Sequence, residues 1–284
     1  MRWGSGRRSE NIEDRRGVRV SRGMVGGGVG TLVMILLALY LGVDPTIFLS
    51  QAPTVSVPPA GASREARPAE ENRLAEFVSV VLADTEDTWN DLFRRAGGEY
   101  REPKLVLFTD AVESACGFAD SAVGPFYCPR DEKVYIDLGF YREMRERFRA
   151  PGDFAQAYVV AHEIGHHVQN LLGISEQVQN ARARVSQAEG NRLSVRLELQ
   201  ADCLAGVWAY HADRARNIIE EGDVEEALGA ASAIGDDRLQ KQTRGFVVPD
   251  AFTHGSSEQR VRWFRRGLDS GDIERCNTFD AARL

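Results

Sequence analysis

The segment His162-Glu163-Ile164-Gly165-His166 constrains this chain more than any other feature, because it places the H-E-x-x-H pattern inside a stretch with helical spacing. Residues four apart lie about one turn apart on one face of a helix, so His162 and His166 can direct both imidazoles at one cation. Two imidazole nitrogens placed in this way are typical ligands of a tetrahedral Zn²⁺ ion. Glu163 lies beside the same face, where its carboxylate can take a proton from a water that the metal activates.

A second helical stretch offers the third ligand that a catalytic zinc site needs. Glu198 and Asp202 are four residues apart in a largely apolar segment, so both carboxylates lie on one helix face. Zincins with an acidic ligand have the same E-x-x-x-D pattern, and we predict that Glu198 binds the metal. Asp202 is then expected to accept the second N–H of a ligand histidine and fix its orientation. Asp202 and His211 are the alternative third ligands.

The charge is unevenly distributed along the chain. Residues 1–22 carry seven Arg and three acidic side chains, which gives a net charge of +4. Since the whole chain has a net charge of −7, the remaining residues carry −11. An acidic body argues against nucleic acid as the main partner. The content of 43% hydrophobic and 27% charged residues is typical of a globular protein and excludes a disordered or polytopic membrane protein.

Residues 23–43 form a run of 21 residues without a charge. A helix needs roughly 20 apolar residues to cross the lipid bilayer. Because arginines precede the run and an acidic residue follows it, we predict a cytoplasmic tail over residues 1–22 and a single transmembrane helix over residues 23–43. The rest of the chain would then lie on the periplasmic or extracellular side. A cleaved signal peptide is the alternative, although its apolar region would be only about 7–15 residues long.

Beyond the apolar run we predict an α+β domain. Residues 44–69 hold five prolines and suit an extended linker, which leaves residues 70–284 for the folded domain. Its predicted elements are a helix over residues 70–95, strands over 104–108 and 133–138, a helix from Asp153 to about Leu172, one from Asn191 to about Ile219, and one capped by Ser256 and Gln259. The fold class is therefore a small sheet followed by mainly helices.

The chain has four cysteines, at positions 116, 128, 203 and 276. An even number in an exported domain permits two disulfides, for which three pairings are possible. We favour Cys116–Cys128 with Cys203–Cys276, because the first pair closes a short loop rich in glycine and proline. A zinc site made of the four cysteines is disfavoured, since the C-x₂-C spacing does not occur.

Several stretches of the sequence resemble those of the bacterial family of neutral zinc metallopeptidases (YpfJ-like proteins). The resemblance extends over nearly the whole chain and includes residues 11–16, 124–129, 134–138, 157–170, 198–203 and 274–279. It implies a zincin-like metallopeptidase fold, Zn²⁺ as the cofactor and a protein or peptide as the substrate. We therefore predict a membrane-anchored zinc endopeptidase that also contacts the lipid bilayer through one helix. The alternatives are a non-catalytic zinc-stabilised envelope binding domain and a metal hydrolase that acts on a non-protein amide.

A more distant similarity concerns the membrane CAAX-type and heat-shock metalloproteases, which follow the two metal motifs with Thr-His-Pro and an Arg six residues after that His. This chain has His254 and Arg260 at that spacing, with Gly255 in place of the proline. The resemblance implies that His254 donates to the oxyanion of the tetrahedral intermediate, a contribution of about 2.7–4 kcal/mol. Arg260 would hold the local geometry. The alternative is that His254 lies in a turn before a helix capped by Ser256.

Two histidines and one strand complete the set of candidates. The strand Val134–Leu138 is a candidate platform for an extended peptide, with an ordinary core strand as the alternative. His167 adjoins Glu163 on the helix but points away from the two ligands, so we expect a structural role. His211 lies near the end of its helix and is interpreted as a surface residue.

Overall fold

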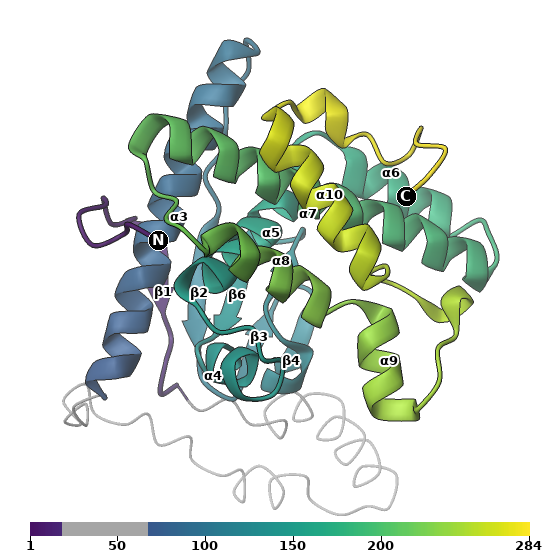
Figure 1. The fold of residues 1–284 in the computed structure, drawn as a ribbon, viewed down its shortest axis with the longest axis horizontal. Coiled ribbons are helices and arrows are strands. Elements are labelled where there is room, and N and C mark those ends of the chain that lie inside the picture. The colour runs from purple at the N-terminus through teal and green to yellow at the C-terminus, as the bar shows by residue number, and fades with distance from the viewer. Residues whose placement is uncertain (19–67) are drawn as a thin grey trace, which may run out of the picture. The chain divides into compact units, whose positions relative to one another are not determined.

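A four-stranded sheet forms one layer of the fold (Figure 1). The structure is a computed structural model that describes residues 1–18 and 68–284. In spatial order the strands are β1 (Ile12–Asp14), β2 (Lys104–Phe108), β6 (Lys133–Asp137) and β5 (Phe126–Cys128). The first three run parallel, and β5 runs antiparallel to β6. The two predicted strands are therefore confirmed, and both are interior strands of the sheet. A separate hairpin pairs β3 (Ala111–Ser114) with β4 (Gly117–Asp120).

Helices make up most of the rest of the described chain, which confirms the α+β class. They are α3 (Ala69–Arg95), α4 (Gly139–Glu146), α5 (Asp153–Leu171), α6 (Ile174–Arg182), α7 (Gln187–Arg216), α8 (Asp223–Ala233), α9 (Asp236–Arg244) and α10 (Ser257–Ser270). The predicted capping box of Ser256 and Gln259 opens α10. The predicted start of a helix at Asn191 is wrong, because α7 begins at Gln187 with Ser186 as its N-cap, and Asn191 instead donates a hydrogen bond to the Asp250 carbonyl.

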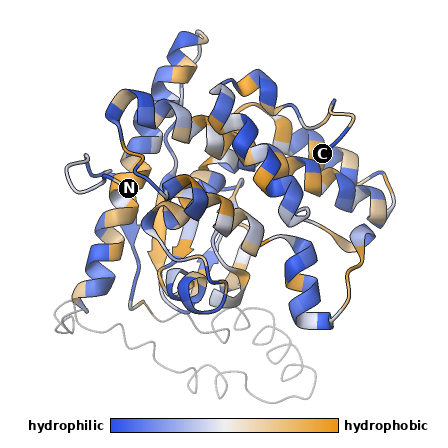
Figure 2. Ribbon diagram, in the orientation of Figure 1, coloured by the Kyte–Doolittle hydropathy of each residue, from blue (hydrophilic) through white to orange (hydrophobic). Residues whose placement is uncertain are grey.

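The core joins the sheet to α5 and the helices beyond it. Trp89, Trp208 and Trp263 are fully buried and come from α3, α7 and α10, which are far apart in the sequence. Four consecutive residues of β2, Leu105 to Phe108, are buried, as expected for a strand covered on both faces. Figure 2 shows the central strands of the sheet as largely hydrophobic and α9 as mostly hydrophilic, which matches the position of α9 at the periphery.

Helices α7 and α10 pack against each other unusually closely. A Cβ atom at Gly206 of α7 would overlap the Phe264 carbonyl oxygen, and one at Gly267 of α10 would overlap the Cys203 carbonyl oxygen. Glycine at both positions therefore lets the two backbones approach, and this close packing brings the start of α10 over the centre of α7. The predicted disulfides Cys116–Cys128 and Cys203–Cys276 are both present, and the second ties the C-terminal region to α7.

The N-terminal segment, residues 1–17, is part of the same compact unit as residues 70–284. Strand β1 pairs with β2 from Ile12 to Asp14, and the Met1 nitrogen lies 2.6 Å from Asp153 Oδ1 and 3.2 Å from Asp223 Oδ1. The sequence instead predicted a separate tail over residues 1–22 and a domain that begins at residue 70. The difference arises because β1 finds its partner about 90 residues later in the chain, which a local pattern does not reveal.

The predicted transmembrane helix and most of the predicted linker lie outside the described residues. Among the helices of residues 1–18 and 68–284, none is long and apolar enough to span a membrane. The pairing of β1 with β2 nevertheless constrains the topology, since two hydrogen-bonded strands cannot lie on opposite sides of a bilayer.

Candidate metal centre

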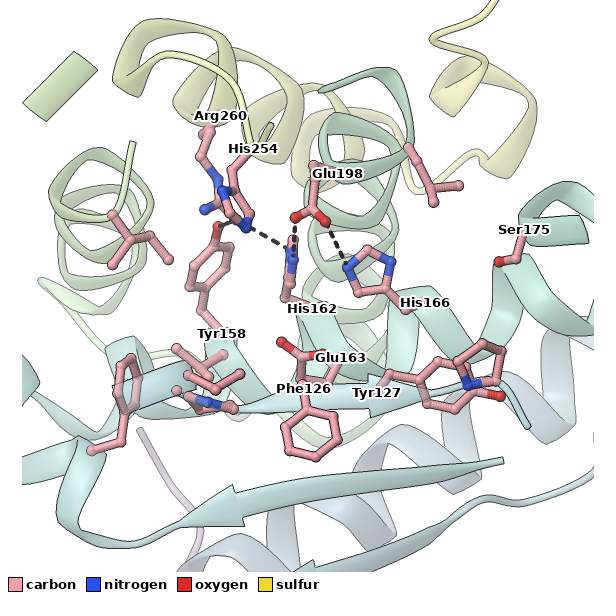
Figure 3. Close-up of a pocket in the computed structure, with 18 of the residues that line it drawn as sticks. Phe126, Tyr127, Tyr158, His162, Glu163, His166, Ser175, Glu198, His254 and Arg260 are labelled. Atoms are coloured by element: carbon pink, nitrogen blue, oxygen red, sulfur yellow. Dashed lines mark hydrogen bonds and ion pairs between the residues drawn. The ribbon is translucent and has the colours of Figure 1, made fainter. Parts of the chain in front are cut away.

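Helix α5 carries the H-E-x-x-H pattern at its crossing with α7. A Cβ atom at Gly165 would lie 2.9 Å from the Ala201 carbonyl oxygen of α7, so the glycine between the two motif histidines permits a close crossing. This approach brings Glu198, one turn before the crossing on α7, opposite the two imidazoles (Figure 3).

The three predicted ligands converge on one point. Glu198 Oε2 lies 3.2 Å from His162 Nε2, and Glu198 Oε1 lies 3.5 Å from His166 Nε2. All three donor atoms lie within 4.8 Å of one another. Two donors bound at about 2.1 Å to one tetrahedral ion would be about 3.4 Å apart. The donor set and its spacing therefore fit a single Zn²⁺ ion.

The other ring nitrogen of each histidine is held by a buried polar partner. His162 Nδ1 donates to Asp202 Oδ1 at 2.8 Å, as predicted. His166 Nδ1 donates to Gln169 Oε1 at 2.9 Å, and Gln169 in turn donates to the Leu197 carbonyl. These contacts fix each ring with Nε2 directed toward the site, the usual role of partners behind metal-binding histidines. Gln169 was not predicted from the sequence. The one indication of its role was that it is a polar residue one turn after His166 on a helix that is otherwise largely apolar.

Asp202 is the hub of this arrangement. Its side chain is 0% exposed, and it accepts hydrogen bonds from the Tyr158 hydroxyl and from Arg260 Nε and Nη2, the latter two at 2.9 Å. Arg260 is itself buried and lies 3.4 Å from His162 Nδ1. Asp202 therefore lies behind His162 rather than beside Glu198, and Arg260 is held next to His162 by its two hydrogen bonds to Asp202.

The pKa values reflect a concentration of buried charge. Burial lowers the pKa of His162, but the Asp202 and Glu198 carboxylates outweigh burial and raise that pKa to about 10. Burial raises the pKa of Asp202, but Arg260 and His162 overcome it and hold that pKa at about 2. Glu198 likewise has a pKa well below its usual value, because the two histidines outweigh its burial. The site thus presents ionised carboxylates, and binding of a metal must displace the proton from His162.

Glu163 lies in a cleft of about 1110 Å³ together with the three ligands, Tyr158, His254 and Arg260. Figure 3 shows its carboxylate between the ligand histidines and Phe126 of β5. The wall of the cleft that faces the three candidate ligands includes Phe126 and Tyr127, so β5 is the strand that lies across from them. The prediction that Val134–Leu138 is the substrate platform is wrong, because β6 lies between β2 and β5 and is an ordinary core strand.

His254 lies at the cleft as predicted, and its side chain is 50% exposed. Its Nδ1 is 3.2 Å from Asp236 Oδ1, and this hydrogen bond raises the pKa of His254. Asp236 begins α9 and was not singled out in the sequence, because it meets His254 only through the tertiary fold.

The two remaining histidines lie away from the ligands. His167 is fully buried, accepts a hydrogen bond from the Tyr127 hydroxyl and donates to the Arg101 carbonyl, and burial lowers its pKa. It is a neutral ring that ties α5 to the β5 wall, in keeping with the structural role expected. His211 contacts the Gly271 carbonyl at the other end of α7, so it does not contribute to the metal centre.

Comparison with known proteins places this site in a family. The model of the family described as "Putative neutral zinc metallopeptidase" matches residues 1–279. The "Uncharacterized protein YpfJ" of Escherichia coli K12 is 51% identical over 290 residues, covering 98% of this chain and 99% of that protein. The "Uncharacterized protein Rv2575" of Mycobacterium tuberculosis H37Rv is 41% identical over 262 residues, covering 87% of this chain and 86% of that protein. No solved structure matches. The chain therefore belongs to the neutral zinc metallopeptidase family, whose cofactor is Zn²⁺.

Proposed function

We propose that this protein is a zinc-dependent endopeptidase that hydrolyses peptide bonds with Glu163 as the general base. One observation carries the proposal: the donor atoms of His162, His166 and Glu198 lie within 4.8 Å of one another, and Glu163 lines the same cleft. Three protein ligands are the usual number in catalytic zinc sites, whereas structural sites use four. The membership of a peptidase family supports a protein or peptide as substrate.

When bound at such a site, zinc polarises a carbonyl oxygen and lowers the pKa of water to about 7. Glu163 accepts the proton of the attacking water and then donates it to the nitrogen of the leaving amine, as general base and then acid. His254 donates a hydrogen bond to the oxygen on which negative charge develops. Asp202 and Gln169 keep the two ligand histidines in place during these steps.

We propose that β5 binds the substrate backbone. In the part of the chain that the structure describes, β5 is an edge strand, and two of its residues, Phe126 and Tyr127, line the cleft. An extended peptide can add to such an edge through backbone hydrogen bonds, which read side chains only weakly. The Cys116–Cys128 disulfide anchors the end of β5 to the neighbouring hairpin and so supports this wall.

The test is the substitution Glu163→Gln in the full-length protein. We expect the zinc content to stay unchanged while cleavage of an unfolded protein falls by at least about 10²-fold, the usual contribution of a general base. Glu176→Gln is the matched control, since Glu176 is another carboxylate at the cleft and lies on α6. A Glu163→Gln protein that cleaves at the wild-type rate would refute the assignment of the base.

Two further assays of the wild-type protein separate the alternative functions. A non-catalytic binding domain would hold zinc but leave every unfolded protein and peptide intact, with or without a chelator. A hydrolase of non-protein amides would release products from cell-wall fragments that mass spectrometry identifies. The presence of Glu163 favours catalysis, because a structural site has no use for a carboxylate in that position.

We also propose that the domain functions in an oxidising compartment, on the periplasmic or extracellular side of the cell membrane. Its two disulfides support this location, because such bonds are rare in reducing compartments. The pairing of β1 with β2 supports the same side for residues 1–17, because a single membrane crossing by residues 23–43 would put the two paired strands on opposite sides.

The topology can be tested with cysteines substituted for the exposed residues Arg8 and Arg265. In intact cells, both should react with a thiol reagent that does not cross the inner membrane. Labelling at position 265 alone would instead support a cytoplasmic tail.

A further inference from the structure

Asp236, the first residue of α9, binds the turn that carries His254. Its Oδ2 accepts hydrogen bonds from three successive backbone N–H groups, those of Thr253 at 2.7 Å, His254 at 2.6 Å and Gly255 at 2.9 Å. The Asp236 N–H in turn donates to the Gly255 carbonyl at 2.9 Å. Convergence of successive N–H groups on one anion is a strong way to fix a backbone turn.

Gly255 explains why this turn can form. Its φ angle is +96°, a region that only glycine adopts readily, and a Cβ atom there would lie 3.1 Å from Leu199. Proline, which stands at this point in the more distant metalloproteases, has no N–H and a fixed negative φ. The departure from the Thr-His-Pro pattern therefore supplies the third hydrogen bond to Asp236.

The second carboxylate oxygen of Asp236 contacts the imidazole ring of His254. Asp236 Oδ1 lies 3.2 Å from His254 Nδ1, and the Thr253 hydroxyl lies 3.1 Å from the same nitrogen. With Nδ1 held in this way, His254 can present only Nε2 to the cleft. Figure 3 shows His254 on the α10 side of the cleft, across from Phe126 of β5, with the metal ligands between the two walls.

We propose that Asp236 is a positioning residue for the reaction: it fixes the orientation and tautomer of His254 so that Nε2 faces the oxygen of the scissile carbonyl. The proposal rests on the proposed peptidase function. A proton held on Nδ1 by a buried carboxylate orients the ring and selects which nitrogen is available for the substrate. Asp236 then affects turnover through His254, without touching the substrate.

The experiment is a double-mutant cycle on the zinc-loaded, full-length protein with a peptide substrate. Loss of an oxyanion donor costs about 10²–10³ in kcat, so we expect that range for His254→Ala. Asp236→Asn should lower kcat by at least about 10-fold, with KM changed less than about 3-fold, because it misorients the same donor. In the His254→Ala background, Asp236→Asn should cost nothing further, since the two residues act as one unit.

Asp237→Asn is the matched control. Asp237 is the next residue of α9 and binds the N–H and hydroxyl of Ser257 at the start of α10, but it does not contact His254. It should leave kcat nearly unchanged in both backgrounds. If Asp236→Asn lowers kcat by the same factor with and without His254, its role is merely structural and the proposal is wrong.

A second measurement on the wild-type protein guards against a variant that does not fold. Nitrogen-15 NMR of the zinc-loaded protein should show that Nδ1 of His254 stays protonated over the whole pH range in which the protein is folded. A neutral ring with its proton on Nε2 would overturn the proposal. If the wild-type protein cleaves no peptide, the proposed function fails, whereas the NMR result still decides whether Asp236 holds His254.

Discussion

Two buried carboxylates, Asp202 in α7 and Glu86 in α3, each hold a segment that is distant in the sequence. Asp202 binds Arg260 of α10 together with the ligand His162. Glu86, which is 1% exposed, accepts hydrogen bonds from three residues of the N-terminal segment, Arg7, Ser9 and Asn11. Burial of a carboxylate is costly unless it is paired, so both segments should stabilise the fold by pairing with these carboxylates.

The partners of the two carboxylates differ. Those of Asp202 are the buried Arg260, the Tyr158 hydroxyl and the proposed metal ligand His162, so we expect the pairing to couple stability to zinc binding. Those of Glu86 are two neutral groups and the half-exposed Arg7, so the pairing serves only to dock the N-terminal segment. We therefore expect loss of Asp202 to affect both stability and zinc binding, and loss of Glu86 to affect stability alone.

The largest effect should come from Asp202→Asn. Removal of one partner of a buried ion pair leaves Arg260 uncompensated, at a cost of about 3–5 kcal/mol. Loss of the partner behind His162 should also weaken zinc binding by about 10–100-fold. Urea unfolding of the zinc-loaded protein and competition with a chelator measure the two quantities.

Glu258→Gln is the control for that substitution, because Glu258 is an exposed carboxylate on α10 that pairs with Arg262. It should change the free energy of unfolding by less than about 0.5 kcal/mol. An Asp202→Asn protein with normal zinc affinity would show that Asp202 supports the fold but not the ligand.

The second-largest effect should be the dependence of stability on acidic pH, which reports the pairing of Asp202. The pKa of Asp202 falls from its usual 3.8 to about 2 in the folded protein, so its contribution to stability is complete above pH 3.8 and is lost as pH falls through about 2. At 1.36 kcal/mol per unit, this contribution is about 2 kcal/mol. The free energy of unfolding should therefore decline less steeply in Asp202→Asn than in the wild type as the pH falls from 4 toward 2. Parallel declines in the two proteins would contradict the pairing.

Glu86→Ala should have a smaller effect of about 1–2 kcal/mol, because some of the donors that it leaves can reach water. Zinc affinity should not change, and the backbone amides of β1 should exchange hydrogen faster. Asp87→Ala is the control, since Asp87 is the next residue, also pairs with Arg7 and is exposed. A fall in zinc affinity in Glu86→Ala would remove the distinction between the two carboxylates.

The sequence predicted which side chains come together at the candidate metal centre, because the two motifs are local helical patterns. The spacing of His162 and His166, and that of Glu198 and Asp202, follows the turn of one helix, and the structure brings both pairs together. The partners from elsewhere were harder to find. Asp236 reaches His254 across 18 residues and a turn, which no helical or strand period encodes.

The N-terminal segment could not be predicted for a related reason. Strand β1 has only three residues, two of them acidic, and it lies among arginines that are typical of a solvated tail. In the structure several of these charges are paired with the domain. Glu13, for example, accepts a hydrogen bond from Lys133 of β6 at 2.7 Å. The sequence shows where these charges lie along the chain, but it does not show which of them find an oppositely charged partner in the folded protein.

The pair of Glu13 and Lys133 provides the smallest and sharpest test of how the N-terminal segment is held. Both side chains are partly exposed, so Lys133→Gln should lower the free energy of unfolding by less than about 1 kcal/mol. The loss should shrink further at high salt, because exposed charges are screened while the buried Glu86 contacts are not. Unfolding in urea at low and high salt measures both effects. A loss larger than that of Glu86→Ala would mean that surface charge, rather than the buried carboxylate, holds β1 against the sheet.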